Sequence, residues 1–443
     1  MTINGFSGYQ SKYCSQVKTN LPVNVLVGKR VAVDLYLLVF QSRAVALKEI
    51  VTPKLVMSGT EFFPLVQEAT KKRFFQRMLK LYTYGWYPIF CVDADFAHPL
   101  RARVRERRGE KNESLGKKIT IAQNQLQNCD PLLQMQAVDE YVKYVQQKVY
   151  DGVFPLVIQF RNILRSLGFP VVSPEDIFVG QNFSSDGEAV AAALTRHNLA
   201  DIAYTNDTDC HSYGAYNCVL EVSDQSKTCV IRNLNDMLNI MQVDFFGFQL
   251  VTILAGTDFN DNIPQFAFGK ALKLVRETKY HPLQILALQV YQLMTWYGNQ
   301  GGNVQEKVPR EWACSSLRIS EQEMTTVEQS FAINFTMPVC QIYQILHPAL
   351  VSNPLLQKLC HPNINFFAVY PIFRSTEIIN PDLRVDFDTE KFAKNARAVF
   401  RNEGIEPLLV NFISDIPALQ GIKLQEPEKS NGSETRNTEE KEI

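Results

Sequence analysis

The feature of this chain that most constrains its fold is a series of short apolar runs that each lead into acidic residues. Examples are VAVD, PIFCVDAD and ILAGTD. Runs of this kind are typical of buried strands that deliver carboxylates to one edge of a parallel sheet, where ligands of α/β folds bind. The acids in the series are Asp34, Asp93, Asp186, Glu188, Asp207, Asp209 and Asp258. Their order predicts an α/β protein with an acidic site at one sheet edge.

So many carboxylates at one edge would repel one another, and the pattern therefore predicts bound divalent cations. Mg²⁺ suits the site best, because it takes a few carboxylate oxygens and keeps positions for water and phosphate. Mn²⁺ is the expected substitute. For any single Asp after a strand, a helix N-cap or turn residue is an equally good interpretation. The joint set favours a metal centre.

Six segments, in order, resemble motifs of the flap endonuclease/XPG family of structure-specific 5′-nucleases, over roughly residues 1–285. They are MTINGF at the N-terminus, GKRVAVD ending at Asp34, GWYPIFCVD ending at Asp93, DGEA at 186–189, NDTD at 206–209 and LAGTDF at 254–259. Each match is weak by itself. Together and in order they identify the chain as a divergent member of this superfamily.

The resemblance implies roles for the acids. Asp34, Asp93 and Glu188 would hold the first metal, with Asp186 nearby through water. Asp207, Asp209 and Asp258 would hold or approach the second. Two cations about 3.5–4 Å apart stabilise the attacking and leaving oxygens of a phosphodiester. The implied reaction is hydrolysis that leaves a 5′-phosphate.

One assignment stays open at this point. Glu175 and Asp176 lie nearer than Asp186 to the strand expected at 169–172, and they compete for the same role. Asp186 and Glu188 are preferred because the Ala-rich segment AVAAAL follows them, which can pack tightly under a site. This choice requires an insertion in the preceding loop.

A basic cluster follows Asp93. It consists of Arg101, Arg103, Arg105, Arg107, Arg108, Lys111, Lys117 and Lys118. On a helix, Arg101, Arg105 and Arg108 share one face, which suits a phosphate clamp, although a solvated face is the alternative. The family has two basic residues seven apart that contact the scissile phosphate, and Arg101 with Arg108 match that spacing. Tyr36 stands near the place where the family stacks a base on an aromatic ring, although a core tyrosine fits equally well.

The expected architecture is a doubly wound, mostly parallel sheet flanked by helices, as in PIN and 5′-nuclease folds, with a helical arch and a mostly helical C-terminal extension. Strands are expected at 24–40, 85–94, from 169, at 201–205 and at 216–222, and helices at 61–84, 156–167, 187–199 and 244–255. The expected regions are 1–98 (N-terminal nuclease), 99–150 (arch), 151–285 (internal nuclease), 286–424 (C-terminal helices) and 425–443 (disordered tail).

Three departures from the family pattern stand out. Thr2 replaces the glycine that normally follows the initiator. The glycine-rich hairpin that grips duplex phosphates through backbone amides and a monovalent cation appears as QFAF at 265–268, without glycine. Loss of these glycines should hinder close approach of the backbone to a phosphate. No clamp-binding box is recognisable near the C-terminus.

Charge, cysteine content and hydropathy limit the kinds of binding surface and the cellular location expected for the protein. The net charge of −1 means that any nucleic-acid surface must be a local cluster. Nine cysteines without C-x-x-C spacing predict reduced thiols. No apolar stretch is long enough for a membrane span or signal peptide. We expect an intracellular protein, nuclear or cytoplasmic and not secreted, of cellular or viral origin.

The sequence therefore predicts a Mg²⁺-dependent, structure-specific endonuclease that acts on branched or flapped DNA in replication, repair or recombination. An RNA endonuclease of the same superfamily is the first alternative, because the altered hairpin weakens the argument for duplex DNA. A catalytically inactive scaffold is the second. Retention of all seven acids argues against the scaffold.

Overall fold

The computed structural model describes residues 17–424 except for 96–97, 129, 131–132, 151, 180–182, 279–281, 300–302, 304, 318, 362 and 365. The N-terminal segment with Thr2 and the expected tail at 425–443 lie outside the described residues.

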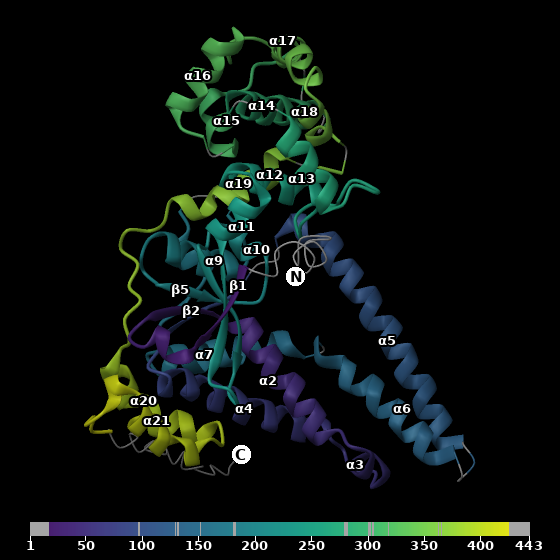
Figure 1. Ribbon diagram of the computed structural model, residues 1–443, viewed down its shortest axis with the longest axis vertical. Helices are drawn as coiled ribbons and strands as arrows, with labels where there is room; N and C mark the ends of the chain where they lie inside the picture. Colours follow the sequence, from purple (N-terminus) through teal and green to yellow (C-terminus); the bar gives the residue numbers. More distant parts are fainter. Residues whose placement is uncertain are drawn as a thin grey trace, which may run out of the picture.

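A mixed sheet of seven strands forms the centre of the protein (Figure 1). In order across the sheet the strands are β1 (Lys18–Pro22), β7 (Thr228–Asn233), β6 (Asn217–Ser223), β5 (Ile202–Tyr204), β2 (Arg30–Asp34), β3 (Tyr87–Cys91) and β4 (Val171–Val172). The strands from β6 to β4 are parallel, whereas β7 pairs antiparallel with both β6 and β1. The expected mostly parallel α/β sheet is confirmed.

The sheet is buried on both faces, as its apolar strands require. In β2, Val31 and Val33 belong to one hydrophobic cluster and Ala32 to the other, because successive side chains point to opposite faces. The helices of the first face are α2 (Leu35–Ile50), α4 (Phe63–Thr83) and α7 (Val153–Ser166). The helices of the second face are α9 (Gly187–Arg196), α11 (Leu234–Met241) and α12 (Phe245–Ala255).

Two C-terminal helices complete the first face. They are α20 (Thr389–Asn402) and α21 (Leu409–Asp415), which pack on α7 and α4 respectively. Phe392, Phe400 and Phe412 are fully buried there, and the Phe412 ring lies 5.9 Å from that of Phe75. The region expected as a C-terminal extension therefore supplies part of the core under the sheet.

A long helical pair projects from the body (Figure 1). It consists of α5 (Ala102–Asn128) and α6 (Gln134–Gln147), which pack on each other. Val138, Val142 and Val145 of α6 are buried against the far end of α2 and the start of α4. Because only this inner side is apolar, the hairpin is fixed along one side of α6 while much of α5 is exposed.

A group of helices caps the second face at the opposite end of the molecule (Figure 1). The group contains α13 (Phe268–Glu277), α14 (Pro282–Asn299), α15 (Arg310–Leu317), α16 (Glu321–Phe331), α17 (Val339–Val351), α18 (Pro354–Leu359) and α19 (Phe366–Arg374). Its core is continuous with that of α12, on which α13 and α19 pack. The stretch 286–370 is mostly helical, as expected.

The strand expected at 24–40 is correct only over Arg30–Asp34, because Val23–Leu26 form a 3₁₀ helix and the residues after Asp34 form α2. The strand ends at Asp34, and Leu35 begins α2. The Asp34 side chain caps this helix by accepting a hydrogen bond from the Leu37 amide at 3.2 Å. An apolar run that is buried as a strand and then as a helix shows no change in periodicity, and the cap is the only local signal. Strands β1 and β7 were not expected.

In the described part of the chain, no single helix is long and apolar enough to cross a membrane; α11 and α12 reach that length and composition only as a pair bent by 79°.

Candidate metal centre

Three of the seven acids lie at the carboxyl ends of neighbouring parallel strands. Asp34 ends β2, Asp93 follows β3, and Asp207 follows β5. Because β5, β2 and β3 are adjacent and parallel, these ends meet at one edge of the sheet. The strands thus bring together acids that lie far apart in sequence.

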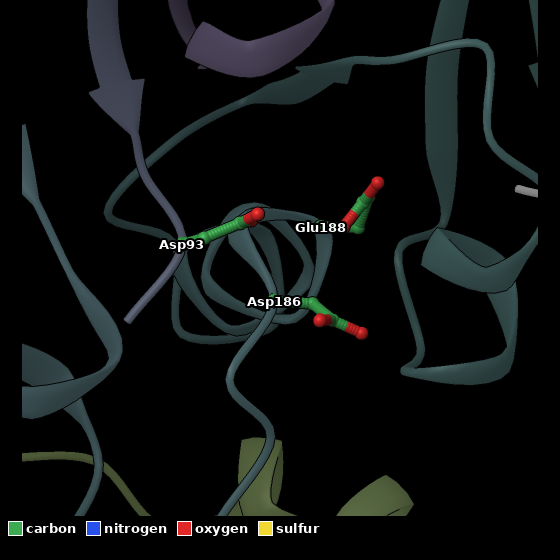
Figure 2. Close-up of side chains that lie close together, drawn as sticks. All are labelled: Asp93, Asp186 and Glu188. Carbon is green, nitrogen blue, oxygen red and sulfur yellow. The ribbon is translucent and has the colours of Figure 1, made fainter. Parts of the chain in front are cut away.

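Asp186 and Glu188 reach the same edge from the start of α9. Asp186 is the N-cap of this helix and Glu188 lies in its first turn. The Gly187 amide donates a hydrogen bond to Asp93 Oδ1 at 2.9 Å. One carboxylate oxygen from each of Asp93, Asp186 and Glu188 lies within 4.8 Å of the other two (Figure 2). We call these three residues the acidic triad.

Gly187 allows this close approach. A Cβ at this position would lie 3.3 Å from the carbonyl oxygen of Cys91 and 3.3 Å from the carbonyl carbon of Val92. Such contacts are tight, so a side chain here would push the start of α9 away from the end of β3. The glycine therefore supports the short distance between the carboxylates of the acidic triad.

Glu175 and Asp176, the rival pair, do not lie in the acidic triad. Both belong to α8 (Pro174–Ile177). Asp176 closes a capping box with Ser173 and pairs with Arg165 at 2.9 Å. Glu175 accepts a hydrogen bond from the amide of Asp95 at 3.1 Å. Asp186, by contrast, lies beside Asp93.

The remaining acids, Asp209 and Asp258, come from helical segments. Asp209 begins α10 (Asp209–Ser212), and its amide donates to Asp207 Oδ1 at 3.0 Å. Asp258 follows α12, and the helix expected at 244–255 is therefore confirmed. Asp209 is only 7% exposed, and its Oδ1 has no hydrogen-bond partner among the described residues.

Burial and mutual repulsion disfavour the charged forms of these carboxylates. Burial and then the charge of Asp93 raise the pKa of Asp34 from its usual 3.8 to about 7. Burial and then Asp186 raise the pKa of Asp93, and burial and then Asp34 raise that of Glu188 well above its usual value. The pKa of Asp209 is raised well above its usual value by burial and then by Asp258. The site therefore holds more negative charge than its own surroundings stabilise.

Arg101 supplies the closest positive charge. Its guanidinium pairs with Asp186 Oδ1 and donates to Asp258 Oδ2 at 3.0 Å. Burial lowers the pKa of Arg101, but the charges of Asp186, Asp93 and Asp258 raise it well above its usual value. The guanidinium also lies over the Phe259 ring, 5.8 Å from its centroid. Arg101 is thus held inside the acidic site rather than on a solvated helix face.

The other expected cations lie farther out. Arg108 is 42% exposed and approaches Asp258 Oδ2 at 3.7 Å. Arg105 donates to the carbonyl oxygen of His98 at 3.0 Å. Arg101 lies in the 3₁₀ turn η3 (Pro99–Arg101) that leads into α5, whereas Arg105 and Arg108 lie in the first turns of α5. The start of α5 therefore forms a basic wall beside the carboxylates.

A cavity of 170 Å³ opens between the acids and this wall. It is lined by Asp34, Tyr36, Leu37, Phe40, Asp93, Arg101, Arg108, Glu188, Asn206 and Asp207. Tyr36, expected on the first strand, lies instead in the first turn of α2 and is partly buried at the cavity. Two aromatic rings and two arginines thus share one cavity with four acids.

The donor set fits divalent cations of the Mg²⁺ type. Its side-chain donors are carboxylate oxygens, the ligands that hard cations prefer. The buried Asp209 Oδ1 without a hydrogen bond is an oxygen that such a cation would satisfy. Asp93, Asp186 and Glu188 are close enough to share one ion. The other four acids lie around the acidic triad, but their carboxylate oxygens are not all within 4.8 Å of those of the triad. They are Asp34, Asp207, Asp209 and Asp258.

Sequence reasoning missed the residues that hold the acids in place. Ser184 and Tyr213 are fully buried, and both hydrogen-bond to Asp186. Phe259 and His98 pack edge to face at 5.4 Å beside Arg101. A serine two residues before an N-cap acid was the only local signal for Ser184. Nothing in the sequence around Tyr213 distinguishes it from a core aromatic.

The hairpin between α12 and α13 keeps an unusual backbone without glycine. Gln265 has φ +59°, in the left-handed region that glycine favours. Its carbonyl oxygen accepts a hydrogen bond from Lys270 Nζ at 2.8 Å. The nitrogen of Lys358, on α18, lies 5.6 Å from the centre of the Phe266 ring. Gln265 thus adopts a left-handed backbone conformation that is uncommon for a residue other than glycine.

The fold and the clustered carboxylates define an α/β protein with an acidic site of the kind that holds divalent cations. A model of the XPG I-region family matches residues 184–258, which contain five of the seven acids. Flap endonuclease 1 of Methanococcus aeolicus is 23% identical over 193 residues, 43% of this chain and 53% of that protein. Flap endonuclease 1 of Saccharolobus solfataricus is 24% identical over 274 residues, 59% of this chain and 71% of that protein.

Residues 184–258 thus match the XPG I-region family model, and parts of the chain are similar to flap endonuclease 1 of two organisms. The chain spans only about half the length of some curated relatives, with 53% of the M. aeolicus protein and 57% of the Nanoarchaeum equitans flap endonuclease 1 covered. Among solved structures, the catalytic core of Rad2 in complex with DNA substrate matches with a TM-score of 0.47 and 14% identity, covering 91% of this chain and 98% of that one. Human GEN1 in complex with Holliday junction DNA matches with a TM-score of 0.39 and 17% identity, covering 79% and 75%.

Proposed function

We propose that this chain is a structure-specific endonuclease that hydrolyses phosphodiester bonds in branched or flapped DNA with the help of two Mg²⁺ ions. The observation that carries the proposal is the acidic triad, formed by acids from two distant segments at the carboxyl edge of the sheet. The match of residues 184–258 to the XPG I-region family and the similarity to flap endonuclease 1 support the same reaction class.

Each group has a role in this proposal. Asp93, Asp186 and Glu188, with Asp34 beside them, hold one cation. Asp207, Asp209 and Asp258 hold or approach the other. When bound, the two ions neutralise charge on the scissile phosphate and make hydroxide available near neutral pH.

The chain's own cations orient the substrate. Arg101 and Arg108 contact the scissile phosphate, because their guanidinium groups lie at the rim of the acidic cavity and can form bidentate hydrogen bonds. Tyr36 offers a ring at the same cavity against which a base can stack.

The test is direct cleavage by the purified full chain with Mg²⁺. Four labelled substrates are compared: 5′-flap DNA, a four-way DNA junction, single-stranded DNA and single-stranded RNA. The proposal expects cleavage of branched DNA that needs Mg²⁺ and is lost in Asp93→Asn. Cleavage of RNA alone would establish the RNA endonuclease instead. No cleavage of any substrate, with the fold intact by circular dichroism, would establish the inactive scaffold.

A further inference from the structure

A closed ring of three hydrogen bonds holds Asp186 from behind. The Asp186 amide donates to Ser184 Oγ at 3.2 Å, Ser184 and Tyr213 hydroxyls lie 3.0 Å apart, and Tyr213 Oη donates to Asp186 Oδ2 at 3.2 Å. Because the Tyr213 hydroxyl donates its hydrogen bond to the Asp186 carboxylate, it can only accept from Ser184, and the Ser184 hydroxyl is therefore the donor of that pair. Every donor in the ring then has an acceptor.

The ring divides the two oxygens of Asp186 between two tasks. Oδ2 accepts the hydrogen bond of the Tyr213 hydroxyl, whereas Oδ1 pairs with Arg101 and accepts a 3.5 Å hydrogen bond from Ser185 Oγ. Because Ser184 and Tyr213 are fully buried, water does not compete for these hydrogen bonds. The carboxylate plane of Asp186 is therefore fixed.

Tyr213 is itself anchored from the C-terminal part of the chain. Its ring lies 5.2 Å from that of Phe373, at the end of α19. Its carbonyl oxygen accepts a hydrogen bond from Thr376 Oγ1 at 2.8 Å. Thr376 also accepts a hydrogen bond from Arg196 of α9 at 3.1 Å. The tyrosine is thus fixed to the helix that carries Asp186 and to the helices beyond residue 282.

We propose that Tyr213 is a positioning residue that turns Asp186 so that a single oxygen, Oδ1, is presented to a divalent cation. This inference rests on the proposed function, because it takes Asp186 as a metal ligand. Tyr213 is fully buried and does not line the cavity. It acts through the hydrogen bond that its hydroxyl gives to Oδ2. A carboxylate held in one orientation binds a cation without losing rotational freedom, and groups that orient ligands in this way affect metal affinity strongly.

The experiment compares the full chain with Tyr213→Phe, which keeps the ring against Phe373 and removes only the hydroxyl. Mn²⁺ is titrated by isothermal calorimetry. The expected result is a loss of Mn²⁺ affinity of about tenfold, in the range seen when partners of metal ligands are removed. On flap DNA at a Mg²⁺ concentration below saturation, kcat should fall while the KM for DNA stays constant, and saturating Mg²⁺ should recover most of the loss.

Two controls make the result specific. Tyr82→Phe makes the same chemical change in the buried core of α4, remote from the acids, and should leave Mn²⁺ affinity unchanged. In an Asp186→Ala background, Tyr213→Phe should cause no further loss of affinity, because its partner is gone. An additive further loss there would overturn the assignment.

The outcomes separate this inference from the proposed function. If Tyr213→Phe is folded and binds Mn²⁺ as tightly as the parent, the positioning role is overturned even if the parent cleaves DNA. If the parent cleaves nothing, the proposed function fails, while the Mn²⁺ titration still decides the role of Tyr213. If the parent binds no Mn²⁺, both are overturned.

Discussion

Arg101 Nη2 donates a hydrogen bond to Asp258 Oδ2 at 3.0 Å, across 157 positions of sequence. The same guanidinium pairs with Asp186, so one side chain joins the base of the helical hairpin to acids after α12 and before α9. At 16% exposure it is the most buried of the ion-paired cations at this site, and without metal it offsets part of the repulsion between the acids.

Arg101→Ala should therefore destabilise the metal-free protein at neutral pH by about 3 kcal/mol, because it leaves buried carboxylates without their counter-charge. Saturating Mg²⁺ should recover most of this loss. Arg108→Ala is the matched control: this exposed cation should contribute less than about 1 kcal/mol. Thermal melts with and without Mg²⁺ measure both effects. Equal destabilisation by the two variants would contradict the inference that Arg101 is the main counter-charge of the buried carboxylates.

Asp93→Ala and Asp207→Ala should each lower cleavage of flap DNA by on the order of 10³-fold or more, because each removes a ligand of one proposed cation. Without metal, both variants should be at least as stable as the parent, since a repelling charge is gone. Added Mg²⁺ should stabilise them less than the parent. Single-turnover rates and melts at several Mg²⁺ concentrations test this pair of effects, and unchanged rates in both variants would refute the metal centre.

The metal-free protein should lose stability as pH rises from about 4 to about 7. The pKa of Asp34 is raised from its usual 3.8 to about 7 in the folded state, so between these values the folded state binds more protons than the unfolded state. The free energy of unfolding therefore falls with rising pH in that window. Asp34→Asn should flatten the slope. Urea unfolding at each pH, in EDTA, provides the measurement, and a rise in stability over the same window would show that the sign is wrong.

Gly168→Ala should lower the free energy of unfolding by more than the cost of placing an alanine at a positive φ angle. Gly168 has φ +78°, and a Cβ there would lie 2.2 Å from the carbonyl oxygen of Asp388, in the segment before α20. Gly404→Ala is the matched control, because Gly404 has φ +68° with nothing within 4 Å of a Cβ. We expect about 1 kcal/mol for Gly404→Ala and about 1–3 kcal/mol more for Gly168→Ala. A similar loss of unfolding free energy in both variants would show that the backbone around Asp388 moves to accommodate the new Cβ.

The hairpin that contains Gln265 should not show the strong, specific potassium requirement that the family's glycine-rich turn implies. Gln265 and Ala267 carry side chains where the family pattern has glycine, and these side chains should hinder close approach of the backbone to a phosphate. Cleavage in potassium is compared with cleavage in a large inert cation at equal ionic strength. A marked potassium preference would show that the ion site persists.

The placement of Asp93 and Glu188 at element boundaries was predictable from their neighbours, because an apolar strand precedes Asp93 and an Ala-rich helix follows Glu188. The boundary at Asp34 was not, because the residues on both sides are apolar and only the helix cap separates strand from helix. The hydrogen bond from Tyr213 to Asp186 joins the end of α10 to the start of α9, and no local sequence pattern predicts this tertiary contact. The same is true of α20 and α21, whose phenylalanines pack on helices more than two hundred residues earlier.

The packing of α20 and α21 on α7 and α4 forms late during synthesis, after all the acids have been translated. Every acid of the site has left the ribosome once residue 258 has emerged, yet Phe392, Phe400 and Phe412 of the core beneath the sheet are still to be translated. Until they arrive, the nascent chain exposes the apolar surfaces of α4 and α7. A polypeptide interrupted before α20 would carry all seven carboxylates without the packing that holds their strands and helices in register.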